Sequence, residues 1–160
     1  MKIRFLAAAA LAASSMMAVT AHAADTPGSN PSVKTPSIAE RMAIARKAID
    51  AKDWTKAMSE LNIAVREEPR NADVHNLLGY SYRKRATPDL AKAFEHYGTA
   101  LKLDPRHKGA HEYIGEAYLM DKKPAEAEKH LVQLEAICGN KTCEEYQDLA
   151  KSIAQYKAKN

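Results

Sequence analysis

The segment HEYIG, residues 111–115, comes within one residue of the HExxH pattern of zinc peptidases. In that pattern two histidines one helical turn apart bind zinc, and the glutamate acts as general base. Gly115 stands where the second histidine would be, which excludes this mechanism. His107 lies four residues before His111 and offers a different pair of ligands. A metal-handling site formed by His107, His111 and Glu112 is therefore one functional hypothesis.

Other patterns that would indicate catalysis are absent from the sequence. Cys138 and Cys143 stand in CGNKTC followed by a glutamate, so the covalent haem motif CxxCH is missing. A cysteine nucleophile would need a free thiolate beside a histidine, whereas these two cysteines more simply form a disulfide. No strand is predicted that a phosphate-binding glycine loop could follow. We therefore predict a protein that is not an enzyme and has no cofactor.

The first 23 residues have the features of a secretory signal peptide. A basic start with Lys2 and Arg4 leads into an alanine-rich apolar stretch and ends in the small-x-small sequence Ala21-His22-Ala23. The stretch is too short and too interrupted by serines for a membrane anchor. We expect cleavage after Ala23, a periplasmic or secreted mature protein without a membrane span, and an oxidising environment that favours the disulfide Cys138–Cys143.

The net charge of the chain gives no reason to expect nucleic acid or a membrane surface as a partner. The formal charge is +4 for the whole sequence and falls to +2 once the two basic residues of the signal are removed. Basic and acidic residues alternate throughout, as they do on solvated helical surfaces.

Helical spacing of apolar residues begins after a short leader. Residues 24–36 contain three prolines and few apolar side chains, which predicts a flexible segment. From 37 to 160 apolar residues recur at spacings of three and four, and no stretch alternates like a strand. Helix boundaries are indicated by the capping box of Ser37 and Glu40, by Thr87-Pro88 as a start, by Gly139 as an end, and by Thr142 with Glu145 as the last start.

The helical region repeats itself. Pro69 and Pro105 are 36 residues apart, as are Gly79 and Gly115, and a period of this size indicates stacked helix pairs. The sequence resembles the tetratricopeptide repeat, which carries small, aromatic and proline residues at these positions. The residues that carry the resemblance are Ala45, Trp54, Ala57, Leu61, Ala64 and Pro69 in the first repeat, Leu78, Gly79, Tyr82, Ala93, Tyr97, Ala100, Leu101 and Pro105 in the second, and Ile114, Gly115, Tyr118, Ala127 and Leu131 in the third.

The predicted fold is therefore all-α, with antiparallel helix pairs stacked as a short right-handed solenoid. Residues 37–160 form one domain with repeats at about 37–70, 71–106 and 107–139. A helix at about 142–158 has apolar residues on one face and is expected to cap the last repeat. Gly115 is expected to pack against the paired helix of its own repeat, because only a small residue fits where helix axes approach closely.

The resemblance also implies a binding groove, because the first helix of each repeat lines the concave face in tetratricopeptide proteins. We expect the groove to bind a protein or peptide partner, with Tyr80 as an aromatic anchor and Arg83 and Glu116 pairing with its charges. The family's clamp for carboxylate termini is excluded by Leu77 and by the first-repeat groove residues. The groove residues that we predict are Met42, Arg46, Asn76, Tyr80, Arg83, Lys84, Glu112, Glu116, Leu119 and Met120.

The histidines have a less specific interpretation within this repeat pattern. His107 and His111 fall at the start of a helix, outside the repeat's core positions, so we expect a structural or surface role. The remaining histidines of the mature chain, His75, His96 and His130, share no face that the sequence reveals. The leading hypothesis is a non-enzymatic interaction module in the periplasm, and the metal-handling protein is the alternative.

Overall fold

The computed structural model describes residues 34–159. The predicted signal peptide and most of the predicted leader lie outside the described residues. The chain divides into two units, 1–34 and 35–160, and the second contains the whole helical domain. Everything below concerns this second unit.

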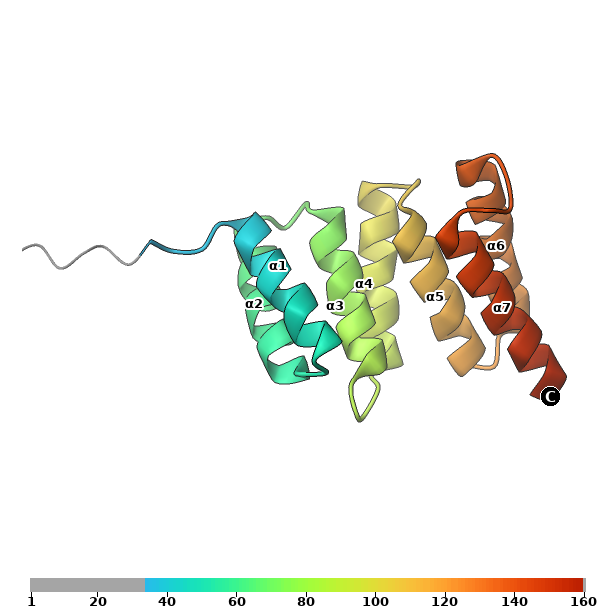
Figure 1. Cartoon of the computed structure of the whole chain (residues 1–160), viewed down its shortest axis with the longest axis horizontal. Coiled ribbons are helices and arrows are strands. Elements are labelled where there is room, and N and C mark those ends of the chain that lie inside the picture. Colours follow the sequence, from blue (N-terminus) through green and yellow to red (C-terminus); the bar gives the residue numbers. More distant parts are fainter. Residues whose placement is uncertain (1–33, 160) are drawn as a thin grey trace, which may run out of the picture. The chain divides into compact units, whose positions relative to one another are not determined.

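Seven α-helices make up the domain, and residues 34–159 contain no strand. Figure 1 shows them in two layers, with the odd-numbered helices in front of the even-numbered ones. Helices α1, α3 and α5 each pack against the helix that follows them, and α7 packs on both α5 and α6. The all-α repeat fold that the sequence predicts is confirmed. The helices are α1 (Ile38–Asp50), α2 (Trp54–Glu67), α3 (Ala72–Lys84), α4 (Leu90–Leu103), α5 (Lys108–Met120), α6 (Pro124–Cys138) and α7 (Glu144–Lys159).

The ends of the helices are set by side chains that bind free backbone groups. Ser37 and Glu40 form the predicted capping box at the start of α1, and Gly139 ends α6 in the left-handed conformation, with φ of 70°. The predicted start at Thr87-Pro88 is wrong, because Asp89 caps α4 by accepting from the Lys92 N–H. The turn at 85–89 is two residues longer than the turns at 51–53 and 121–123, and the cap of α4 lies past the proline.

Small residues allow the helices to approach one another closely. Ala45, Ala57, Ala93 and Ala127 are fully buried between paired helices. A Cβ atom on Gly79 would lie 2.6 Å from the Tyr97 ring of α4, the pair partner of α3. A Cβ on Gly115 would lie 2.7 Å from Leu149 of α7. The nearest neighbour of Gly115 is thus the capping helix α7, whereas the sequence analysis expected the pair partner α6.

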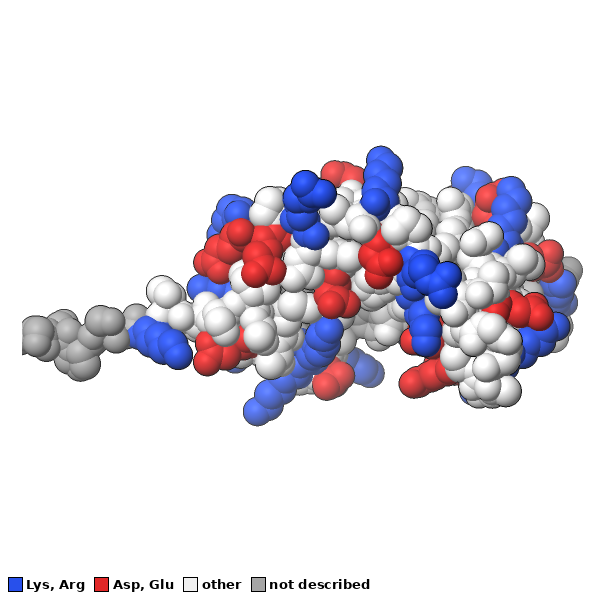
Figure 2. Space-filling view, turned by 90° about the horizontal axis from the view of Figure 1, so that it is seen from above, with Lys and Arg blue, Asp and Glu red and all other residues white. Residues whose placement is uncertain are grey.

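The surface of the domain carries mixed charge. On the face that Figure 2 shows, lysines and arginines stand between aspartates and glutamates without a large area of one sign. No helix among the described residues is long and apolar enough to cross a lipid bilayer.

Candidate functional site

The front layer of helices carries a hollow that several helices share. We call the side of α1, α3, α5 and α7 that faces away from the back layer the inner face. The hollow has a volume of about 270 Å³, and helices from three successive repeats contribute to its walls. We call it the α1–α3 hollow, and it is lined by Arg46, Ile49, Asp50, Leu77, Tyr80 and Tyr113.

Two tyrosines form the aromatic wall of the α1–α3 hollow. The ring centroids of Tyr80 and Tyr113 are 4.8 Å apart and the rings are tilted, a favourable geometry for aromatic pairs. The guanidinium carbon of Arg83 lies 5.4 Å from the Tyr80 centroid and 5.6 Å from the Tyr113 centroid. Burial raises the pKa of Tyr80 and raises the pKa of Tyr113 to about 12, so both hydroxyls stay neutral. The ring faces of this wall are apolar, and the Arg83 guanidinium stabilises the two rings by cation–π interactions.

Arg83 belongs to a polar network that crosses three helices of the inner face. Its side chain is only 4% exposed, and its Nε donates to the Tyr97 hydroxyl at 3.3 Å. Its Nη2 lies 2.6 Å from Glu116 Oε2 in α5. The Ser152 hydroxyl of α7 donates to the other Glu116 oxygen at 3.1 Å. Arg83 and Glu116 thus neutralise each other inside the protein, whereas the sequence prediction had them pairing with a partner's charges.

Glu112 is the least satisfied charged group of the inner face. The residue is 8% exposed, and no described residue forms a hydrogen bond or ion pair with its carboxyl. Burial, followed by the nearby charges of Glu116, Asp148 and Glu145, raises the pKa of Glu112 to about 8. Arg83 acts in the opposite direction but is already paired with Glu116. At neutral pH the Glu112 carboxyl is therefore mostly protonated.

Asn76 is the residue of α3 that corresponds to Glu112, 36 residues earlier. It is 6% exposed, and its Oδ1 is buried with no hydrogen-bond partner. A Cβ on Gly109 would lie 3.1 Å from Asn76 Nδ2, so the absence of a side chain there leaves room for the amide. Two neighbouring repeats thus place an unsatisfied acceptor at the same position.

The other predicted groove residues are spread over different surroundings. Met42 packs against the hydrophobic core around Leu61, Leu78 and Tyr97. Leu119 is buried in a second hydrophobic cluster, together with Leu149 and Ile153 of α7. Lys84 is exposed on α3. Met120 is 45% exposed and borders a second hollow, of about 250 Å³, together with residues of α7. Of the ten predicted residues, Arg46 and Tyr80 line the α1–α3 hollow, and a shared groove of all ten stays a prediction.

The sequence prediction missed Tyr113 and Leu77 as lining residues. They are 36 residues apart and each follows a predicted groove residue, Asn76 in α3 and Glu112 in α5. That spacing was a usable signal, but the family pattern assigns other positions to the groove. It also missed Glu145, Asp148 and Ser152, because α7 lies outside the repeat register.

The structure does not assemble the metal site of the alternative hypothesis. His107 caps α5, its Nδ1 accepting from the Ala110 N–H, and its Nε2 lies 3.1 Å from Asp73 Oδ1. His111 Nε2 lies 3.1 Å from the Pro105 carbonyl and its Nδ1 lies 2.9 Å from His130 Nδ1. All four ring nitrogens are engaged with other groups, so they do not converge with Glu112 on an ion. His111 is also 6% exposed, which corrects the view that it lies outside the core.

The histidines instead form two equivalent pairs between paired helices. His75 Nδ1 lies 3.1 Å from His96 Nδ1, and the His75 Nε2 lies 3.0 Å from the Pro69 carbonyl. The third repeat has the same arrangement with His111, His130 and Pro105, and in each repeat a tyrosine, Tyr82 or Tyr118, stacks on the second histidine. The spacings of 36 and 34 residues in the sequence were the signal that could have revealed these pairs.

The first repeat has an ion pair where the other two repeats have histidines. Arg41 Nη1 lies 3.0 Å from Glu60 Oε2, and both residues occupy the equivalent positions of α1 and α2. Arg41 is 8% exposed. We call Arg41–Glu60, His75–His96 and His111–His130 the cross-helix pairs.

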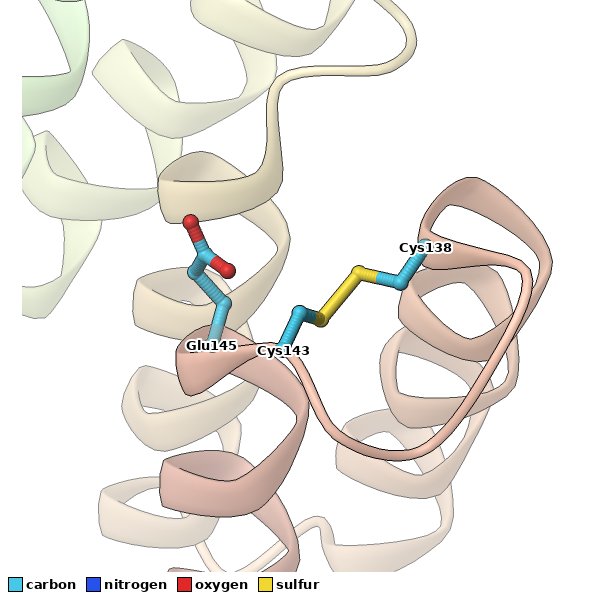
Figure 3. A group of neighbouring side chains, drawn as sticks. All are labelled: Cys138, Cys143 and Glu145. Carbon is cyan, nitrogen blue, oxygen red and sulfur yellow. A yellow bond between two sulfur atoms is a disulfide. The ribbon is translucent and has the colours of Figure 1, made fainter.

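A disulfide joins Cys138 at the end of α6 to Cys143 just before α7. Figure 3 shows it beside Glu145, and the two sulfurs and a Glu145 oxygen lie within 4.8 Å of one another. Since the sulfurs are bonded to each other, they are not available as thiolate ligands for a metal. The bridge fixes the start of α7 and thereby helps to place Glu145 and Asp148 beside α5.

Comparison with known proteins finds similar structures but no match in sequence. No family model matches the chain, and no curated protein matches it in sequence. A complex of the TPR2B domain of yeast Sti1 with an Hsp70 peptide is similar in structure, with a TM-score of 0.67 and 14% identity over 77% of this chain and 98% of that one. The first TPR domain of Spaghetti (RPAP3), bound to the HSP90 peptide SRMEEVD, has a TM-score of 0.64 and 16% identity over 76% of this chain and 93% of that one. The predicted fold is thereby confirmed: the chain has the fold of a tetratricopeptide-repeat domain.

Proposed function

We propose that the protein is a non-enzymatic binding module that holds a segment of a partner protein on its inner face. The observation that carries this proposal is the α1–α3 hollow with its wall of Tyr80 and Tyr113. The wall offers rigid aromatic area with little loss of side-chain entropy on binding. Exposed Arg46 and Asp50 border the same hollow and can bind polar groups of the segment. The two similar structures carry peptides, which supports the same use of this fold.

A partner that ends in an acidic motif does not fit the residues of this hollow. Met42 is packed against the core, and Leu77 offers no amide at the position where the family's carboxylate clamp has asparagine. The charge of Arg83 is matched internally by Glu116. The proposed partner is therefore a segment that contributes an apolar side chain to the hollow.

Site-specific photocrosslinking tests this proposal. A photoreactive amino acid is placed at Arg46, beside the hollow, and in a matched variant at Lys102, which is exposed on α4 in the back layer. We expect a defined protein adduct from Arg46 that is absent from Lys102. Tyr80→Ala combined with the Arg46 probe should weaken it, since loss of such an anchor costs about 2 kcal/mol. Equal adducts from both positions, or none from Arg46, would contradict binding at the inner face.

Export to the periplasm belongs to the same proposal. The signal-like residues 1–23 lie outside the described residues, and the disulfide Cys138–Cys143 is of the kind that persists in oxidising compartments. Mass spectrometry of the protein from a fractionated cell should find a chain that begins at Ala24 in the envelope fraction. An unprocessed chain in the cytoplasmic fraction would contradict export.

A further inference from the structure

The Glu112 carboxyl lacks a partner within the described part of the chain. The residue is 8% exposed, and its carboxyl oxygens keep contact with solvent. A molecule at the inner face can therefore reach them. An ionised carboxylate in such surroundings is costly unless an opposite charge compensates it.

The groups around Glu112 are mostly acidic. Glu116 on the same helix and Glu145 and Asp148 on α7 all oppose its ionisation. The cation that faces it is Arg83 of α3, and that charge is paired with Glu116 at 2.6 Å. This part of the inner face therefore has more acidic groups and hydrogen-bond acceptors than cations and hydrogen-bond donors.

Asn76 is a second unpartnered acceptor on the neighbouring helix. Its Oδ1 is buried and unpartnered, and its amide lies against Gly109, one turn before Glu112 on α5. Buried acceptors are normally satisfied, so each one left open is unusual. Asn76 Oδ1 is sealed from solvent, so it adds to the acceptors beneath this part of the inner face, whereas Glu112 is the acceptor that a partner can contact.

We propose that the inner face recognises a lysine or arginine of its partner segment, whose charged group pairs with Glu112. This inference rests on the proposed function of the inner face and specifies its partner. Tyr113, the residue after Glu112, lines the α1–α3 hollow. Besides burial, the charge of Glu112 raises the pKa of both Tyr80 and Tyr113, so its carboxyl lies near the tyrosine wall. A basic residue paired with Glu112 therefore places a neighbouring apolar residue of the segment against this wall. The partner is a segment in which a basic residue and an apolar residue are close together.

A metal ion fits the same acids less well than an organic cation does. Among residues 34–159, Cys138, Cys143 and Glu145 are the group whose ligand atoms lie close enough together for an ion. The oxygens of Glu112, Glu116 and Asp148 do not converge in this way. An extended ammonium or guanidinium group, which does not need a closed ligand shell, matches the dispersed acceptors.

Selection from a random peptide library displayed on phage tests the proposal on the full mature protein. We expect the selected peptides to be enriched in lysine or arginine beside an apolar residue. A synthetic peptide from this selection should bind Glu112→Gln at least about tenfold more weakly than the unchanged protein, since removal of one charge from such a pair is costly. The matched control Glu95→Gln, on the exposed side of α4, should leave the affinity unchanged. Glu112→Gln is isosteric and keeps the domain folded, which circular dichroism checks.

The outcomes separate this inference from the proposed function. Peptides without basic residues that still depend on Tyr80 would overturn the cation inference and leave the binding module intact. No enrichment over a Tyr80→Ala protein would overturn both. Binding of zinc or magnesium ions that Glu112→Gln abolishes, without peptide binding, would also overturn the inference. In the expected case, affinity for the basic peptide rises from pH 6 to pH 9, because Glu112 must lose its proton to pair.

Discussion

The first repeat and the two that follow it fill the same position with different chemistry. Arg41 and Glu60 form an ion pair between α1 and α2, whereas α3–α4 and α5–α6 are joined by His75–His96 and His111–His130. All three pairs bury a polar contact between the helices of one repeat. The fold therefore requires a mutually satisfied pair here, and it does not require a particular residue type.

The histidine pairs constrain the protons that they carry. His111 Nε2 must donate to the Pro105 carbonyl, which leaves its Nδ1 as an acceptor. His130 must then donate from its own Nδ1 across the 2.9 Å contact. If the acceptor Nδ1 also took up a proton, both Nδ1 atoms would carry hydrogen and the hydrogen bond between them would be lost. The interaction within the neutral histidine pair therefore depends on pH, whereas the interaction between Arg41 and Glu60 depends on the salt concentration.

The largest expected effect concerns the small residues of the same repeats. Gly79→Leu and Gly115→Leu should each destabilise the domain by about 3 kcal/mol or more, because Tyr97 and Leu149 fill the space that a side chain would take. Ala45→Gly in the first repeat, where a Cβ is already accommodated, should cost about 1 kcal/mol. Chemical denaturation followed by circular dichroism measures all three. A cost for Ala45→Gly as large as for the leucine variants would contradict this difference between repeats.

The disulfide should have the next largest effect, and it acts at the end of the domain opposite to the first repeat. Reduction should lower the free energy of unfolding by about 2 kcal/mol, because the loop between Cys138 and Cys143 is short. Hydrogen exchange should show the loss in α7 and α5, with α1 and α2 unaffected. A thiol assay on unfolded, unreduced protein should detect no free thiol. Two free thiols would refute the bridge in solution.

Double-mutant cycles at pH 8 sharpen the comparison of the cross-helix pairs. Replacing His111 and His130 by glutamine, singly and together, should give a coupling of about 1 kcal/mol that 1 M salt leaves unchanged. The corresponding cycle with Arg41→Gln and Glu60→Gln should give a coupling that salt reduces, since screening acts on charged pairs. Thermal or urea unfolding provides the values. If salt reduced both coupling energies equally, the proposed difference between a neutral histidine pair and an ion pair would be wrong.

A pH dependence of stability should come from the buried histidines of the second and third repeats, for which the first repeat has no counterpart. Burial lowers the pKa of His96, His111 and His130, the last to about 4 from 6.5. The unfolded chain then binds more protons, so stability is full above pH 6.5 and is lost as the pH falls from 6.5 towards 4. Unfolding curves of His130→Gln should show a flatter dependence in this range. A slope identical to that of the unchanged protein would contradict the assignment.

Glu112 contributes a pH dependence of the opposite sign. Its pKa rises from 4.5 to about 8 on folding, so its contribution is present below pH 4.5 and is lost as the pH rises through 8. Glu112→Gln should therefore stabilise the free protein at pH 9 and leave it nearly unchanged at pH 4. Glu95→Gln again serves as the matched control. A destabilised Glu112→Gln protein at pH 9 would show that the carboxylate is compensated in a way that the structure does not contain.

Most of the fold could be predicted from the sequence, because its signals are local. The capping box of Ser37 and Glu40, the glycine end at Gly139 and the 36-residue spacing of Gly79 and Gly115 each depend on neighbouring residues or on repetition. The cap at Asp89 was missed because Thr87-Pro88 is an equally good local signal, and only the path of the longer turn decides between them. The division of residues 1–36 into signal and leader stays a prediction.

The candidate site was predicted less well, because it depends on side chains from elements that the repeat pattern does not connect. Tyr80 was found, since the family pattern marks its position. The pairing of Arg83 with Glu116 was not, because it requires the distance between α3 and α5. Leu149 and Asp148 lie on α7, whose place against α5 no repeat spacing records. The histidine pairs carried a sequence signal in their spacing, but its meaning required the crossing of paired helices.

The contact of Gly115 with Leu149 also determines where this architecture can be lengthened. A helix-pair array grows by adding units whose interfaces match. The second and third repeats share glycine, histidine and tyrosine at equivalent positions, so a copy of residues 71–106 inserted before His107 would find matching neighbours on both sides. A copy added after α6 would have to displace α7 from α5 and break the disulfide that fixes it. The domain is thus modular in its middle and closed at the end that α7 covers.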